Sequence, residues 1–135
     1  MSADAIRTRL LDLHRPLLAE ALSCADAVAA GWDGDTTTDR DAVVGPYRLA
    51  LERAGLLEPL VAALADAVAD SGRELLAPPV PDIPYLAITT RGIVLRASTA
   101  AGRIVITLAA FEIDPYRRGP PLPEALTVEV YGEQP

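Results

Sequence analysis

The sequence predicts an α+β protein in which N-terminal helices pack on one face of a C-terminal four-stranded antiparallel β-meander. Apolar residues recur every three or four positions through residues 3–77, which is typical of amphipathic helices. Four prolines then crowd residues 78–84, where neither a helix nor a central strand can persist. Beyond them, apolar and polar residues alternate at period two, as in half-buried strands.

These three parts predict one domain over residues 1–135. Residues 1–77 would form a helical layer, 78–84 a stiff connector and 85–131 a sheet layer. Because each layer alone would leave an apolar face bare, we expect the two to share a core. A chain of 135 residues is long enough to bury such a core without disulfides or metals.

The first helical segment covers residues 3–30. Its apolar positions form one stripe, made of Ile6, Leu10, Leu13, Leu17, Ala21, Cys24 and Val28. Pro16 removes a backbone donor and crowds the preceding turn, so a kink or break is expected near residues 13–15. Gly31 is suited to the end of the helix.

Two further helical segments follow an acidic loop. The first is predicted over Asp39–Ala54, disturbed at Gly45-Pro46 and stopped by Gly55. The second begins near Leu57, with Pro59 in its first turn, and ends or loosens at Gly72.

The sheet is predicted from strands at Tyr85–Thr90, Ile93–Thr99 and Arg103–Ile113, with a fourth strand from Leu126 onward. Gly92 and Gly102 close the two short loops between the first three strands, where a residue of positive φ is expected. One face of this sheet would pack on the helices.

Charge and cysteine content narrow the classes of function. The net charge is −7 and a single cysteine, Cys24, excludes an intramolecular disulfide framework and any zinc site of several cysteines. No apolar run approaches the ~20 residues of a membrane span, and the N-terminus lacks the features of a signal peptide. We expect a cytoplasmic protein without a cofactor and without a membrane partner.

All twelve basic residues are arginine, and the chain contains neither lysine nor asparagine. Runs such as ADAVAAGWDGDTTTDRDAVVG are rich in Asp, Ala and Val. In this composition the chain resembles small uncharacterised proteins of halophilic archaea. The resemblance implies a high-salt habitat and carries no functional residue; a GC-rich soil bacterium is the alternative source.

No group of residues predicts a catalytic centre. His14 is the only histidine, and Cys24 lies ten residues further along the same helical segment, about 80° around a helix of 3.6 residues per turn. That placement argues against a Cys/His nucleophile pair, which requires hydrogen-bond contact. We therefore predict no catalytic residue and favour a non-enzymatic protein.

A weak candidate for metal binding is the acidic loop, where Asp33, Asp35 and Asp39 alternate with other residues as in the first half of a calcium loop. The glycine expected at loop position six is missing, and Val44 stands where the acidic twelfth residue should be. A solvated acidic loop followed by a helix start explains the pattern better.

One concentrated basic and aromatic spot occurs on this acidic chain, at Tyr116, Arg117 and Arg118. Arginine is well suited to binding oxyanions, so these residues are the candidate contact for an anion or a partner.

DNA binding is a minor alternative. Residues 51–57, LERAGLL, resemble the turn of a helix-turn-helix, and the hairpins could form a wing. The recognition helix would be Glu58–Ser71, which contains no basic residue. Because phosphate contacts require positive charge, we do not expect nucleic acid as a partner.

The outer face of the predicted sheet is more apolar than a solvated face should be. Val94, Val105, Phe111 and Tyr131 lie on it by the period-two pattern. A second copy of the chain could cover this face. We therefore favour an interaction or assembly module acting through the sheet, with a homodimer as one form. The alternative is a small-molecule-binding protein or enzyme whose pocket lies at the seam between the connector, Trp32 and the helices.

Overall fold

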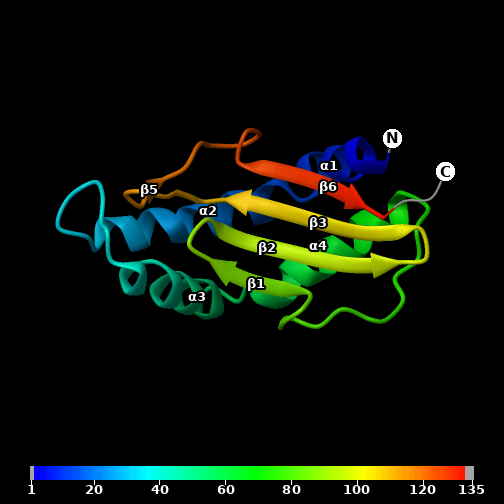
Figure 1. The fold of residues 1–135 in the computed structure, drawn as a ribbon, viewed down its shortest axis with the longest axis horizontal. Coiled ribbons are helices and arrows are strands. Elements are labelled where there is room, and N and C mark those ends of the chain that lie inside the picture. Colours follow the sequence, from blue (N-terminus) through cyan, green and yellow to red (C-terminus); the bar gives the residue numbers. More distant parts are fainter. Residues whose placement is uncertain (1, 133–135) are drawn as a thin grey trace.

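The computed structural model describes residues 2–132 and has the predicted α+β architecture (Figure 1). Four helices come first: α1 (Ser2–Leu13), α2 (Arg15–Ala30), α3 (Val44–Arg53) and α4 (Leu57–Asp70). A short 3-10 turn, η1 (Arg40–Ala42), precedes α3. Within the described residues no helix is long and apolar enough to cross a membrane.

The break predicted near Pro16 is confirmed. The first helix ends at Leu13, His14 is non-helical, and Pro16 occupies the first turn of α2, where its missing N–H costs nothing. The disturbance predicted at Gly45-Pro46 is milder than expected, because both residues fall in the first turn of α3. Gly55 and Gly72 follow α3 and α4 with positive φ of 71° and 85°, as residues that end helices often do.

The main sheet contains β1 (Leu86–Thr89), β2 (Gly92–Thr99), β3 (Gly102–Ala109) and β6 (Leu126–Tyr131). The strands lie in the order β1-β2-β3-β6 and all neighbours are antiparallel, so the sheet is the predicted meander. A small hairpin of β4 (Phe111–Glu112) and β5 (Arg117–Arg118) is inserted between β3 and β6.

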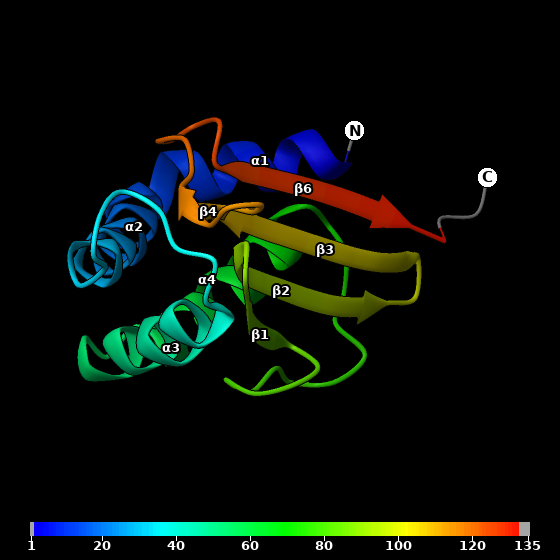
Figure 2. The same ribbon diagram turned by 60° about the vertical axis from the view of Figure 1, so that its left-hand side comes forward.

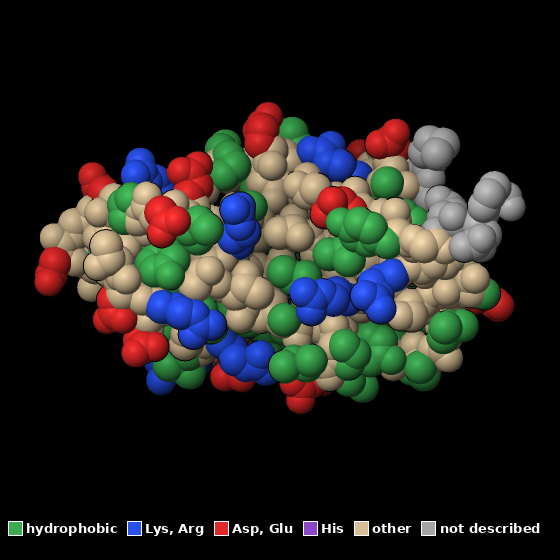
Figure 3. Space-filling model, viewed as in Figure 1, with side chains coloured by type: hydrophobic (Ala, Val, Ile, Leu, Met, Phe, Trp, Pro, Cys, Tyr) green, Lys and Arg blue, Asp and Glu red, His purple; other side chains and the backbone are tan. Residues whose placement is uncertain are grey.

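The helices cover one face of the sheet, and the two layers share one core (Figures 1 and 2). The alternate residues of the central strands that face the helices are buried, namely Ile93, Leu95, Ala97, Ile104, Ile106 and Leu108. On the helical side, α4 contributes Leu60, Val61, Ala63, Leu64, Ala67 and Val68. The opposite face of the sheet is the surface seen in Figure 3, and we call it the outer face.

Helix α4 is therefore a core helix, which argues against the DNA-binding alternative. Its exposed residues are Glu58, Pro59, Ala62, Ala69 and Asp70. None of these is basic, so the exposed surface of α4 offers no positive charge to a phosphate backbone.

The third strand ends earlier than predicted, and this change moves Phe111 off the outer face. Strand β3 stops at Ala109, and the backbone turns so that the amide of Phe111 donates to the carbonyl of Arg91. Phe111 is only 1% exposed and packs against the rings of Trp32 and Tyr47, with centroid separations of 5.9 and 5.2 Å. The predicted position of Phe111 on the outer face is therefore wrong, because the period-two pattern does not continue through this turn.

Candidate functional site

Residues 71–85 join α4 to β1 and form an arch along one strand; from here on we call this whole segment, which includes the proline-rich residues 78–84, the connector. Near its start, the Leu76 amide donates to the Ser98 carbonyl at 3.0 Å. Near its end, the Tyr85 carbonyl accepts from the Arg96 amide at 2.9 Å. Both anchors lie on β2, so the residues between them bow away from the strand. Proline at 78, 79, 81 and 84 removes four backbone donors from the arch, which suits a segment that leaves the sheet.

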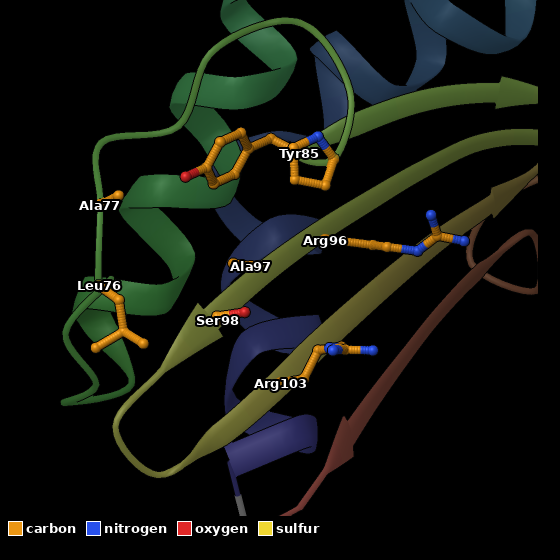
Figure 4. Close-up of a pocket in the computed structure, with 8 residues that line it drawn as sticks. Leu76, Ala77, Tyr85, Arg96, Ala97, Ser98 and Arg103 are labelled. Atoms are coloured by element: carbon orange, nitrogen blue, oxygen red, sulfur yellow. The ribbon is translucent and has the colours of Figure 1, made fainter.

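A hollow of about 460 Å³ lies between this arch and the strands. We call it the arginine hollow, and it is lined by Leu76, Ala77, Pro84, Tyr85, Arg96, Ala97, Ser98 and Arg103. Figure 4 shows the Arg96 and Arg103 side chains extending in the same direction from neighbouring strands. Leu76, Ala77 and the Tyr85 ring lie on the connector side. The hollow thus has a basic part and an apolar part.

The strand register explains why the two arginines are neighbours. Arg96 on β2 pairs with Val105 on β3, and Ser98 pairs with Arg103. Arg96 and Arg103 therefore point to the same face of the sheet from diagonal positions on adjacent strands, within reach of long side chains. Both are exposed, and Figure 3 shows basic side chains near the centre of the outer face.

Neither arginine has a carboxylate partner among residues 2–132. Other arginines of the chain do: Arg9 pairs with Asp66, Arg48 with Glu52, and Arg118 with Asp26. Glu129 stands diagonal to Arg103 on β6 but forms no ion pair with either arginine, so an oxyanion between the two guanidinium groups would reduce their mutual repulsion. The planar guanidinium also matches the geometry of carboxylate and phosphate. The arrangement can bind an anion, with the Ser98 hydroxyl as a further donor from the lining.

The predicted anion contact at Tyr116, Arg117 and Arg118 is organised differently. The Tyr116 backbone pairs with Thr37 through two hydrogen bonds of 2.8 and 3.0 Å. Every guanidinium nitrogen of Arg118 is engaged within the protein: Nε with Asp26 at 2.7 Å, Nη1 with the Ala110 carbonyl and Nη2 with the Leu22 carbonyl. Arg118 therefore ties the β4-β5 hairpin to α2, and only Arg117 of the two arginines projects as an exposed side chain.

The remaining predicted interface residues lie on the outer face with different exposure. Val94 is buried, Val105 is half-buried and Tyr131 is 49% exposed. The Tyr131 hydroxyl faces the Glu129 carboxylate as a hydrogen-bond donor, which raises the pKa of Tyr131. Val105 sits between Arg96 on β2 and Glu129 on β6 in one row across the sheet. The outer face thus carries both signs of charge around a small apolar centre.

The acidic loop does not assemble a metal site. Within residues 2–132, no group of three or more His, Cys, Asp or Glu side chains could hold a metal ion, and this applies to Asp33, Asp35 and Asp39. The Asp39 carboxylate instead accepts from the Asp41 amide at 2.9 Å and caps η1.

His14 and Cys24 have separate surroundings. His14 Nε2 lies 2.8 Å from Asp66 Oδ2, and the same carboxylate receives two hydrogen bonds from Arg9. These bonds, that from Arg9 first, lower the pKa of Asp66 to about 2. Burial, with a smaller effect from Glu20, raises the pKa of the Cys24 thiol, which keeps it protonated and unreactive at neutral pH.

The structure does not bring the connector and Trp32 to one hollow. The connector borders the arginine hollow, whereas Trp32 lines a separate hollow of about 370 Å³ between α2 and α3 and donates from Nε1 to the Ala42 carbonyl at 2.9 Å. Arg96 and Arg103 are not among the site residues predicted from the sequence. Their positions on the same face of consecutive strands could have indicated a basic pair. The path of the connector, which forms the hollow beside them, could not be predicted from the sequence.

Comparison with known proteins gives a family without an assigned activity. No curated protein and no solved structure matches the chain. One family model matches residues 4–131, nearly the whole chain. Its description assigns no reaction, ligand or partner, so the geometry of the arginine hollow is the available guide to function. The chain belongs to the family described as domain of unknown function DUF7988.

Proposed function

We propose that this chain is a non-enzymatic binding module that holds an oxyanion in the arginine hollow on the outer face of its sheet. One observation carries the proposal: Arg96 and Arg103 lie side by side at a hollow, without carboxylate partners among the described residues, on a chain of net charge −7. Arg9, Arg48 and Arg118, at other places on this acidic chain, each form an ion pair with a carboxylate. The hollow is a place where positive charge is left for a ligand.

The size of the hollow is consistent with this function. A volume of about 460 Å³ falls within the range typical of small-molecule sites, roughly 300–1,000 Å³. Its lining includes no histidine, cysteine or acidic side chain that could activate the Ser98 hydroxyl as a nucleophile. Binding is therefore a better account than catalysis.

Isothermal titration with inorganic phosphate tests the proposal. The double variant Arg96→Gln, Arg103→Gln should bind at least tenfold more weakly than the native chain, because charge-assisted hydrogen bonds contribute about 1.5–3 kcal/mol each. Arg91→Gln is the matched control, since Arg91 is exposed in the β1-β2 turn and does not line the hollow. Equal binding by the double variant, or no binding by the native chain, would refute the proposal. All proteins must give the same far-UV circular dichroism spectrum.

Homodimerisation is a second candidate, favoured by the charges of the outer face. Glu129 lies in the same cross-strand row as Arg96, two strands away. In a two-fold interface, Glu129 of each copy could approach the arginines of the other, with Tyr131 and Val105 packed between them. Light scattering across a concentration series should then detect a dimer that Glu129→Gln weakens. A monomer at every concentration would remove this candidate.

The amino-acid composition also supports a proposal about the cellular environment in which the protein acts. The absence of lysine, the acidic surplus and the Asp-rich runs support a high-salt cytoplasm as the place of action. A chain with one cysteine needs no oxidising compartment for its stability.

A further inference from the structure

We infer that the ligand of the arginine hollow is a small amphiphile, a phosphate or carboxylate group joined to a short hydrocarbon body. This inference rests on the proposed function and adds the chemical class of the ligand. Its basis is the division of the hollow into a basic part on the strands and an apolar part on the connector.

The apolar part is built from the connector itself. Leu76, Ala77, Pro84 and the ring of Tyr85 line the hollow on that side. Leu76 is 67% exposed even though its own amide is fixed to β2. A stiff backbone thus holds an apolar side chain open to water at the hollow that Arg96 and Arg103 also line.

The connector carries further exposed apolar side chains outside the hollow. Val80 is 49% exposed and Ile83 is 72% exposed, so the connector holds three of the seven large hydrophobic residues that are exposed among the described residues. Figure 3 shows hydrophobic side chains gathered along the lower right edge, below basic side chains near the centre of this face. Apolar groups concentrated at one rim are typical of a binding surface.

A free inorganic anion would use only half of this site. It would bind the guanidinium groups and leave the apolar wall exposed. A hydrocarbon body attached to the anion would cover Leu76 and the Tyr85 ring, and each CH₂ group buried would contribute about 0.8 kcal/mol, or about fourfold in affinity. The volume of about 460 Å³ suits a small molecule.

A soluble amphiphile fits better than the surface of a membrane. The chain carries a net charge of −7, which opposes approach to anionic lipid headgroups. Only two arginines mark the site, fewer than the clusters of four to eight basic residues that typically recognise such surfaces.

Titration with inorganic phosphate, ethyl phosphate, butyl phosphate and hexyl phosphate tests the inference, with hexanoate as the carboxylate arm and hexanol as the uncharged arm. Affinity should rise at least tenfold from phosphate to hexyl phosphate, and hexanol should bind far more weakly than either charged hexyl compound. Leu76→Ser should reduce the gain with chain length, measured within the variant as the ratio of its affinity for hexyl phosphate to its affinity for inorganic phosphate. Leu13→Ser, at a 54% exposed leucine of α1, is the control and should keep the gain.

The outcomes separate the two proposals. If phosphate binds through Arg96 and Arg103 but chain length adds nothing, the amphiphile inference is wrong and the anion-binding function stands. If hexyl phosphate and hexanol bind equally well, and the double arginine variant binds both as the native chain does, the anion-binding function is wrong. Cosedimentation with vesicles that contain phosphatidic acid, lost on replacing both arginines, would show that the source is a membrane headgroup and would overturn the inference of a soluble ligand.

Discussion

Arg118 and Asp26 join two parts of the chain that lie 92 residues apart, with 2.7 Å between Arg118 Nε and Asp26 Oδ1. The same guanidinium donates to the backbone carbonyls of Ala110 and Leu22 and lies 5.8 Å from the centre of the Phe111 ring. One side chain thus fastens the β4-β5 hairpin to α2 and covers an aromatic residue of the core.

Replacing Arg118 with alanine should destabilise the protein by about 2–3 kcal/mol, because the carbonyls lose a charged donor and the Phe111 ring loses its cover. Arg118→Lys should be intermediate, since an ammonium group cannot reach three acceptors in the same fork geometry. Urea denaturation measures both. Arg117→Ala, at the exposed neighbouring arginine, is the control and should change stability by less than about 0.5 kcal/mol. Equal effects at the two positions would contradict the structural role of Arg118.

Tyr47 links α3 to α2 inside the core. The hydroxyl donates to the Ala21 carbonyl at 2.8 Å, and the side chain is fully buried. Tyr47→Phe should lower the free energy of unfolding by about 1 kcal/mol, the typical value of one hydrogen bond, while leaving the edge-to-face contact with Phe111 in place. Tyr116→Phe is the matched control, because Tyr116 is held through its backbone. A loss of stability in the control as large as that in Tyr47→Phe would rule out this explanation.

The Asp66 carboxylate should make stability sensitive to acid. Hydrogen bonds from Arg9 and then His14 lower its pKa from 3.8 to about 2 in the folded protein. The ionised form therefore stabilises the fold above pH 3.8, and this contribution is lost as the pH falls towards 2.

Asp66→Asn should be less stable than the native chain at pH 6, and the difference should narrow between pH 4 and pH 2. Thermal unfolding followed by circular dichroism across this range measures the narrowing. Asp70→Asn is the control, because it changes the net charge by the same amount as Asp66→Asn. The Asp70 carboxylate lies further from Arg9, with 3.5 Å between Asp70 Oδ1 and Arg9 Nη1. A difference that stays constant with pH would mean that Asp66 acts through packing alone.

Elements with long, regular patterns could be predicted from the sequence. The break at Pro16, the ends of α3 and α4 near Gly55 and Gly72, and the meander with its fourth strand all follow from local rules of periodicity and chain breakers. Phe111 shows where such rules fail. The period-two pattern places Phe111 on the outer face. The backbone instead turns after Ala109, and Phe111 packs against the rings of Trp32 and Tyr47 in the core.

The candidate site was harder to predict than the fold. Strand register places Arg96 and Arg103 on the same face, and the period-two pattern predicts this. The hollow beside them depends on the arch of the connector. That path is set by two backbone hydrogen bonds to β2, and proline content alone predicts stiffness without direction. Conversely, Arg117 and Arg118 are neighbours in sequence, but Arg118 is used in holding the hairpin to α2.

Salt should stabilise the chain if the proposed habitat is correct. A net charge of −7 produces self-repulsion that dissolved ions screen. Simple screening is nearly complete at 1 M, where the Debye length is about 3 Å. A melting temperature that rises by several degrees to 1 M potassium chloride and continues to rise to 3 M would support adaptation to high salt. No increase over dilute buffer would contradict it.

Gly92 occupies a position that no other residue should tolerate. Its φ is 137°, and a Cβ atom there would lie 2.3 Å from the Leu108 carbonyl oxygen and 2.8 Å from the Ala110 amide nitrogen, both backbone atoms that cannot rotate away. Gly92→Ala should therefore cost at least about 2 kcal/mol through backbone strain and displacement of β3. Gly34→Ala is the matched control, because a Cβ atom at Gly34 would have no heavy atom within 4 Å. Urea denaturation of the two variants should show a large loss only at Gly92. Equal stability of the two would mean that the turn between β1 and β2 can relax, which the close approach of Gly92 to the end of β3 argues against.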